Sequence, residues 1–154
     1  MGIGGAAAAM FAVEGAKVVI VDLNKDEAEA KAKTLRDAGG DAVAVQCDVS
    51  KSSEVAASTK RIVDLVGSLD ILVNCAGVVR YGTVVDLAEA DWDLQINVNL
   101  KGTFLMCKNL IPHMTKPGGA IVNTASVQAF ASQQTVPAYA ASKAAIVRLA
   151  ESVA

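Results

Sequence analysis

The sequence has few aromatic residues, a single histidine and no excess of positive charge. Aromatic side chains make up 4% of the 154 residues, and 14 Lys and Arg stand against 16 Asp and Glu, giving a net charge of −2. Binding to nucleic acid needs Lys and Arg gathered on one face, so this balance argues against a nucleic-acid partner. The single histidine, His113, excludes zinc sites built on several histidines, and we expect no metal site.

Long apolar runs and an N-terminal leader pattern are also missing. The apolar stretch 4–13 ends at Glu14, which is too short for a membrane span, and no basic region precedes it. The three cysteines, Cys47, Cys75 and Cys107, are odd in number and widely spaced, which is typical of reduced thiols in a cytoplasmic protein. We therefore expect no membrane partner, a cytoplasmic location and a single globular domain.

Short apolar runs rich in β-branched residues alternate with helical patterns. The expected strands are 17–21, 42–46, 70–74 and 120–123. The expected helices are 5–13, a helix opened by a capping box at Asn24, one capped by Ser50, 91–113, and one from Pro137 to the end. This alternation predicts an α/β fold, a three-layer doubly wound parallel sheet of four strands.

Both ends of the sequence fall inside the pattern. A glycine turn opens the first helix with no strand before it, and residues 144–154 are still periodic without a stop signal. We expect residues 1–154 to be one dinucleotide-binding domain truncated at both ends.

Glycines at the start of the first helix indicate a phosphate site. In Gly2-Ile3-Gly4 the small residues let a phosphate approach the backbone, and the helix N-terminus supplies N–H donors and a positive dipole end. Asp22 ends the first strand and can accept hydrogen bonds from the ribose hydroxyls, while repelling a 2′-phosphate. Asp22 therefore favours NAD over NADP. The alternative is that the glycines only make the helix start flexible and that Asp22 only precedes a turn.

Polar or small residues follow two more strands. Asp48-Val49 could face the adenine, and Asn74, Ala76 and Gly77 could let a cofactor lie close to the backbone. Each is also an ordinary turn residue.

Tyr139 and Lys143 are four residues apart on the last expected helix and so share a face. An ammonium beside a phenol favours the phenolate, which yields an acid/base usable nearer neutrality. Ser126 follows the fourth strand, and its hydroxyl could hold a carbonyl oxygen for protonation. A capping or turn role for Ser126 is the alternative.

Together these motifs resemble the classical subgroup of the short-chain dehydrogenase/reductase family. The matching pieces run in the family's order along nearly the whole chain: Gly2-Ile3-Gly4, Asp22, Asp48, Asn74-Cys75-Ala76-Gly77, Asn99, Ser126 and Tyr139-Ala140-Ala141-Ser142-Lys143.

The resemblance implies an NAD(P)-dependent oxidoreductase of secondary alcohols or ketones. Its catalytic tetrad would be Asn99, Ser126, Tyr139 and Lys143, with Tyr139 as the acid/base and Lys143 also on the nicotinamide ribose. Ser126 would position the carbonyl, and Asn99 would support a water in the proton path. The family also implies a homodimer or homotetramer of the full-length parent. The first strand and the substrate-choosing C-terminal part of the family pattern are absent from this sequence.

Two other readings compete with a hydride-transfer enzyme. A hydrolase using Ser126 and His113 lacks the glycines of a nucleophile elbow and has the wrong order of residues. A truncated, catalytically inert dinucleotide-binding domain is the second alternative.

By the same resemblance, the absent strand belongs between strands 17–21 and 70–74. The crossover helices fix strand positions, so we expect these two strands to stay apart rather than pair.

Overall fold

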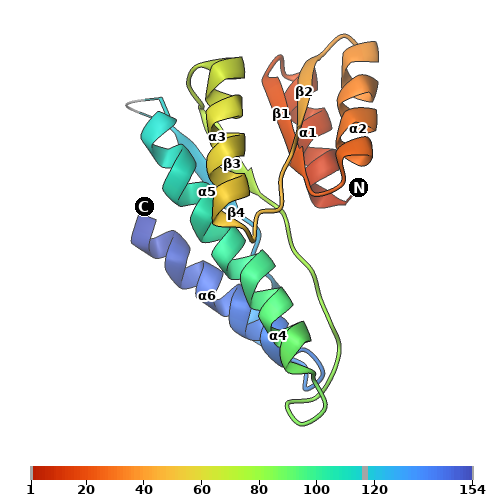
Figure 1. The fold of residues 1–154 in the computed structure, drawn as a ribbon, viewed down its shortest axis with the longest axis vertical. Helices are drawn as coiled ribbons and strands as arrows, with labels where there is room; N and C mark the ends of the chain where they lie inside the picture. The colour runs from red at the N-terminus through yellow and green to blue at the C-terminus, as the bar shows by residue number, and fades with distance from the viewer. Residues whose placement is uncertain (1, 116–117, 154) are drawn as a thin grey trace.

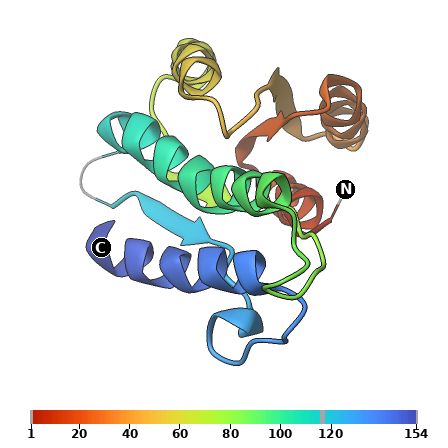
Figure 2. The ribbon, with the colours of Figure 1, turned by 60° about the horizontal axis from the view of Figure 1, so that its bottom comes forward.

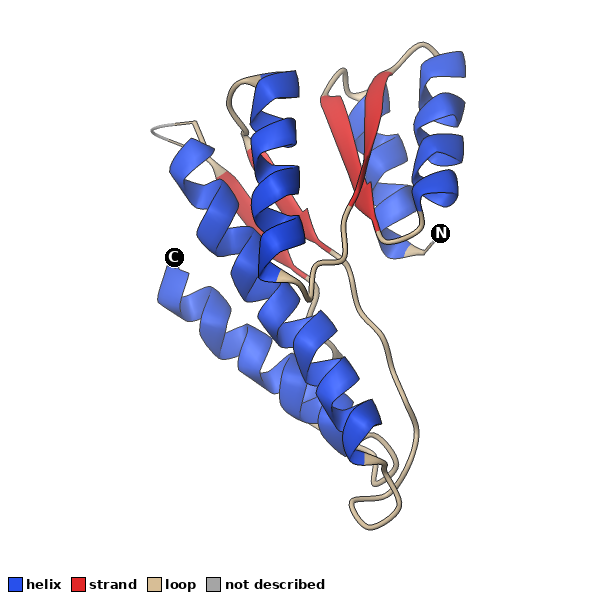
Figure 3. Ribbon diagram, viewed as in Figure 1, coloured by secondary structure: helices blue, strands red, loops and turns tan. Residues whose placement is uncertain are grey.

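The computed structural model describes residues 2–115 and 118–153 (Figure 3). Its helices are α1 (Ile3–Val13), α2 (Lys25–Asp37), α3 (Ser52–Val66), α4 (Glu89–Gln95), α5 (Gly102–Leu110) and α6 (Pro137–Val153). Its strands are β1 (Lys17–Asp22), β2 (Asp41–Gln46), β3 (Ile71–Asn74) and β4 (Ala120–Asn123). In this described part, none of the helices has the length and apolar character needed to cross a membrane.

The four strands form two separate parallel pairs (Figure 1). β1 pairs with β2 from Lys17–Asp41 to Asp22–Gln46, and β3 pairs with β4 from Ile71–Ala120 to Asn74–Asn123. Between the described strands β1 and β3 there is no ladder, so each presents an unpaired edge. The prediction that these strands stay apart is confirmed.

Helices cover opposite faces of the two strand pairs. α1 and α2 pack on β1 and β2, whereas α3 contacts β2 and α5 contacts β3. In Figure 1, α3 and α5 lie in front of β3 and β4, while α1 lies behind β1; Figure 2 shows β4 between α5 and α6. This arrangement is an incomplete Rossmann-like α/β fold, as the sequence predicts.

Two hydrophobic cores hold the layers together. The first lies between α1, α2 and the β1–β2 pair, and its buried members are Ala12, Ile20, Ala28, Ala32, Leu35 and Ala42. The second joins β2, α3, β3 and α5 through Val45, Cys47, Val55, Ile62, Leu72, Leu105, Met106, Cys107 and Leu110. The second core therefore links the two strand pairs across the gap in the sheet.

Helix starts follow the sequence signals in one case and not in another. The Asn24 side chain accepts hydrogen bonds from the N–H groups of Asp26 and Glu27, which confirms the expected cap of α2. The expected cap of α3 by Ser50 is wrong, because Lys51 holds the cap position. The Ser50 hydroxyl instead donates to the Asp48 carboxylate, 2.7 Å away.

The expected helix 91–113 is not continuous. It begins at Glu89, passes through a π-helical turn at Ile96–Lys101, and ends in a 3₁₀ turn at Ile111–His113. From the first turn of α5, the Thr103 hydroxyl donates to the carbonyl of Asn99 in the π turn at 2.7 Å. Wide turns of this kind are found frequently at functional sites.

Candidate active site

Lys143 is a buried cation on α6. Its side chain is 3% exposed, and its ammonium donates to the Thr124 carbonyl at 2.6 Å, just after β4. The ammonium lies 5.5 Å from the centroid of the Tyr139 ring, so the expected pairing on one face is present. Burial lowers the pKa of Lys143, and the neighbouring Cys75 opposes this shift.

Asn99 is fully buried in the π turn, and hydrogen bonds engage both ends of its amide. Its Oδ1 accepts from the Val78 N–H at 2.8 Å, and its Nδ2 donates to the Val78 carbonyl at 3.0 Å. The same Nδ2 donates to the Ser142 hydroxyl at 3.1 Å, and that hydroxyl donates to the Tyr139 carbonyl at 2.7 Å. Asn99 thus connects the segment after β3 with the turn of α6 that carries Tyr139 and Lys143.

Gly77 brings backbone close to these polar groups. A Cβ built at Gly77 lies 3.4 Å from the Asn99 Oδ1 and 3.6 Å from the Lys143 Nζ. A side chain here would occupy the space beside the ammonium. Glycine therefore leaves the space next to the Lys143 ammonium free of a side chain.

Ser126 caps the short 3₁₀ turn Val127–Ala129. Its hydroxyl oxygen accepts a hydrogen bond from the Gln128 N–H at 3.2 Å. This bond uses a lone pair and leaves the hydroxyl proton for a second partner, such as a carbonyl oxygen. Ser126 follows Thr124, which holds Lys143, by two residues.

The start of α1 packs against the chain that follows β3. A Cβ built at Gly4 lies 3.1 Å from the Cys75 Cβ, so the close approach favours glycine. Cys75 also accepts a hydrogen bond at its Sγ from the Thr124 hydroxyl, at 3.3 Å. Gly2 is the N-cap of α1 and has no side chain to cap the helix. The backbone N–H groups in the first turn of α1 therefore receive no side-chain cap from Gly2.

Asp22 and Asp48 make hydrogen bonds within their own turns. One oxygen of Asp22 accepts from the Asn24 N–H at 2.9 Å. Asp48 accepts from both the hydroxyl and the N–H of Ser50, and these bonds lower the pKa of Asp48. The turn alternatives of the sequence analysis are thus realised for both residues, and their contacts with a nucleotide remain predictions.

The remaining predicted cofactor residues lie near the same strand ends. The Asn74 amide donates to the Asn123 Oδ1 at 2.8 Å and ties the ends of β3 and β4 together. Val49 lies against α5, where a Cβ built at Gly102 would come within 2.8 Å of its Cγ2. Ala76 is exposed beside Gly77.

Three residues were not singled out from the sequence: Thr124 and Ser142 of this site, and Gln95, whose Oε1 accepts a hydrogen bond from the Arg80 N–H on the segment that follows Gly77. Ser142 lies inside the Tyr139–Lys143 motif, and Gln95 precedes Asn99 by four residues, so helical spacing from the tetrad was a usable signal for both. Thr124 acts through its backbone carbonyl, and its residue type therefore carried no signal.

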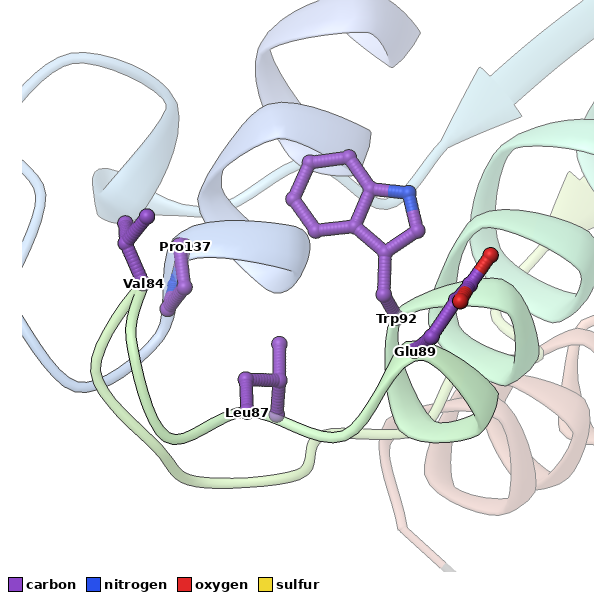
Figure 4. A pocket seen from close by; sticks show the side chains of 5 residues that line it. All are labelled: Val84, Leu87, Glu89, Trp92 and Pro137. Carbon is purple, nitrogen blue, oxygen red and sulfur yellow. The ribbon is translucent and has the colours of Figure 1, made fainter.

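A pocket of about 190 Å³ lies beside the start of α6 (Figure 4). The Trp92 indole reaches from α4 toward the first turn of α6, close to Pro137. The loop between β3 and α4 supplies the other apolar side chains, Val84 and Leu87, and Glu89 completes the lining. The loop that follows the Val78 contact therefore also borders the helix that bears Tyr139.

His113 is exposed at the end of its 3₁₀ turn, and in the described residues no hydrogen bond joins it to Ser126. The hydrolase alternative therefore has no geometric support. Over residues 2–115 and 118–153, no three side chains of His, Cys, Asp and Glu gather as a metal site.

The structure is an incomplete Rossmann-like α/β fold with a Tyr–Lys pair on α6. The family model described as short chain dehydrogenase matches residues 1–154. The chain belongs to this family of oxidoreductases.

Relatives and solved structures agree with the assignment. An uncharacterized oxidoreductase from Bacillus subtilis is 42% identical over 99% of this chain and 56% of its own length. The D-threitol dehydrogenase of Mycolicibacterium smegmatis is 41% identical over 99% of this chain and 59% of its own length. A short chain dehydrogenase structure from Mycobacterium smegmatis has a TM-score of 0.92 at 36% identity, covering 97% of this chain and 63% of that one. The chain thus spans about three fifths of the length of these proteins.

Proposed function

We propose that the protein transfers a hydride between a nicotinamide cofactor and a secondary alcohol or ketone. The observation that carries the proposal is the Tyr139–Lys143 pair, with a buried ammonium 5.5 Å from the phenol ring centroid. Asn99 and Gly77 border the same pair. The substrate class is supported by relatives that are named for D-threitol and for a 3β-hydroxysteroid.

Each member of the tetrad has a separate task. Tyr139 gives or takes the proton of the substrate oxygen, and the Lys143 ammonium stabilises its phenolate. The free hydroxyl proton of Ser126 positions the carbonyl oxygen by a hydrogen bond. Asn99 holds the backbone at Val78, and a water in the proton path near Asn99 remains part of the proposal. The bound cofactor supplies or accepts the hydride.

We assign the cofactor site to the edge where α1 begins and β1, β2 and β3 end. Gly2, Ile3 and Gly4 would receive the pyrophosphate, Asp22 the adenosine ribose, and Asp48 with Val49 the adenine. Asn74, Ala76 and Gly77 would line the path to Tyr139 and Lys143. The carboxylate of Asp22 favours NAD, and NADP is the less favoured cofactor.

Binding and turnover need separate tests. Titration of NADH fluorescence with this chain measures binding directly. Turnover is measured in a chimera in which this chain replaces the matching part of the M. smegmatis D-threitol dehydrogenase, with D-threitol and NAD as substrates. The proposal expects turnover that depends on Tyr139, and a folded chimera without turnover contradicts it.

An inert dinucleotide-binding domain is the second candidate, and the unpaired edges of β1 and β3 favour it. For this candidate the chain binds NADH but has no activity alone. If the chimera is active, the inertness of the chain alone is due to the segments that the chimera adds. If the chimera is inactive, it is due to the residues of this chain.

We also propose that the full-length protein is a homodimer or homotetramer. Helices α5 and α6 leave apolar or small side chains partly exposed, among them Phe104, Ala144 and Val147. Pairing of such helices across a two-fold axis buries both faces. Equilibrium sedimentation of the full-length enzyme at micromolar concentration tests this, and a monomer there contradicts it.

A further inference from the structure

The segment that leaves β3 toward α4 is held by a buried glutamine. Gln95, the last residue of α4, is fully buried, and its Oε1 accepts a hydrogen bond from the Arg80 N–H at 3.0 Å. Its Nε2 donates to the Asp91 carbonyl one helical turn earlier, also at 3.0 Å. The Asp91 carboxylate in turn lies 3.6 Å from the Nε of the Arg80 side chain.

Two more hydrogen bonds fix the same segment on either side of Arg80. Asn99 holds both backbone groups of Val78, and the Gly82 N–H donates to the Thr135 carbonyl at 2.9 Å. Gln95 and Asn99 are four residues apart in sequence. Their buried side-chain amides therefore bind two positions of the segment that are two residues apart, Arg80 and Val78. The segment 78–82 thus has three points of attachment.

A buried amide stabilises the fold little compared with an apolar side chain of the same volume, because its polar atoms lose their hydration. A methionine would fill this space without that cost. What Gln95 adds is direction, because its hydrogen bond to Arg80 holds one backbone position of the loop. Fixing a loop in this way is useful to the protein only where the position of the loop affects a functional site.

The position of segment 78–82 matters because both of its ends meet the candidate active site. Gly77 comes just before it, and a Cβ built at Gly77 would lie 3.6 Å from the Lys143 Nζ. Thr135, which holds its far end, precedes α6 and Tyr139 by a few residues. Both ends of the segment, which we call the wall 78–82, are therefore tied to residues beside or just before the turn of α6 that carries Tyr139 and Lys143.

We propose that Gln95 is a positioning residue, which fixes the wall 78–82 against which the substrate alcohol or ketone lies. The inference rests on the proposed function. Gln95 touches neither reacting group, and it acts through the Arg80 backbone.

The direct test is amide hydrogen exchange, followed by NMR on this chain. In Gln95→Met we expect the Arg80 amide to exchange about tenfold faster or more, while the Val78 amide, held by Asn99, changes less than about twofold. Gln95→Glu keeps an acceptor oxygen in either protonation state, and we expect it to restore most of the Arg80 protection. Gln46→Met is the matched control, because Gln46 is exposed on β2.

Two exchange results overturn the proposal. One is an unchanged Arg80 amide in Gln95→Met. The other is an equal acceleration of all amides, which means that Gln95 contributes only to global stability. If Gln95→Met does not fold, the Gln95→Glu variant decides. Loss of Arg80 protection in a folded Gln95→Glu protein then also overturns the proposal.

The functional test uses the chimera with the D-threitol dehydrogenase. We expect Gln95→Met to raise the KM for D-threitol about threefold or more and to leave the KM for NAD within about twofold. A merely structural role lowers the active fraction, which reduces the apparent kcat at unchanged KM, and this result overturns the proposal. A folded wild-type chimera without turnover overturns the proposed function and the substrate role of the wall, whereas the exchange result still decides whether Gln95 holds Arg80.

Discussion

The two halves of the molecule hold their candidate site residues in different ways. In the first half, from α1 to β2, Asp22 is bonded to Asn24, a close neighbour in sequence. In the second half, from β3 to α6, Asn99 is bonded to Ser142 and to Val78, which lie 43 and 21 residues away. Asp22, which we predict to face the nucleotide, thus lies on a locally built turn, while Asn99 of the proposed tetrad depends on long-range packing.

The two hydrophobic cores also differ, in the size of the side chains that they bury. The first core is made largely of alanines, which let helices approach β1 and β2 closely but bury little apolar area. The second core buries larger side chains, and Val19 and Val21 of β1 also pack against it. The first half therefore depends on the second core for part of its stability, whereas the described members of the first core all lie in the first half.

The largest expected effect is on catalysis in the second half. Tyr139→Phe in the chimera removes the acid/base hydroxyl, and we expect kcat to fall about 10²–10⁴-fold with NADH binding nearly unchanged. Steady-state kinetics and a fluorescence titration measure the two quantities. Ser152→Ala, which removes an exposed hydroxyl on the same helix, is the control. A Tyr139→Phe chimera with most of the wild-type kcat would falsify the assignment.

The next effect tests the unequal dependence of the two halves. We expect Leu35→Ala and Leu110→Ala each to cost about 2–5 kcal/mol, since both leave cavities at buried positions. Leu35→Ala should accelerate exchange in β1 and β2 only, because its core ends there. Leu110→Ala should accelerate exchange in all four strands, because its core includes Val45 and covers β1. Equal acceleration of all strands by both variants would show one cooperative unit instead.

A smaller effect concerns the first half and its choice of cofactor. Asp22→Ala removes the carboxylate that repels a 2′-phosphate. We expect the ratio of kcat/KM for NAD over NADP in the chimera to fall about tenfold, or about 1.4 kcal/mol. Asp26→Ala, at an exposed aspartate in the next turn, controls for net charge. An unchanged ratio places Asp22 away from the ribose.

The smallest effect is on stability in the second half. Burial lowers the pKa of Lys143, so its protonated form opposes folding at neutral pH. We expect Lys143→Met to stabilise the chain by about 1 kcal/mol. The native state binds fewer protons than the unfolded state between the lowered pKa and the ordinary value of 10.5, so wild-type stability rises with pH in this window.

Urea unfolding at several pH values measures the difference between wild type and Lys143→Met. The difference should be largest at neutral pH and shrink toward pH 10.5. Lys108→Met, at an exposed lysine of α5, should show no such trend. A destabilised Lys143→Met protein would mean that the bond to the Thr124 carbonyl outweighs the cost of burial.

Local signals predicted most of the elements and the turn residues. The short β-branched runs became β1 to β4 within a residue or two, and the capping box at Asn24 starts α2. The Ser50 prediction failed because the Ser50 hydroxyl donates to the charged Asp48 carboxylate instead of accepting from an N–H group of α3, and Lys51 holds the cap position. The π turn was not predictable, because it depends on partners of Asn99 in distant segments.

By itself, the sequence determined the family, the α/β alternation, and the pairing of Tyr139 with Lys143 on one helix face, because each depends on spacing along a few turns of chain. Tertiary structure alone decided the setting of that pair. It buried the Lys143 ammonium under the Thr124 carbonyl, and it placed Gly77 and Asn99 beside it. It also brought Gln95 to the Arg80 backbone. These contacts join segments that no local pattern relates, since only the packing of α4 and α6 around the end of β3 sets their distances.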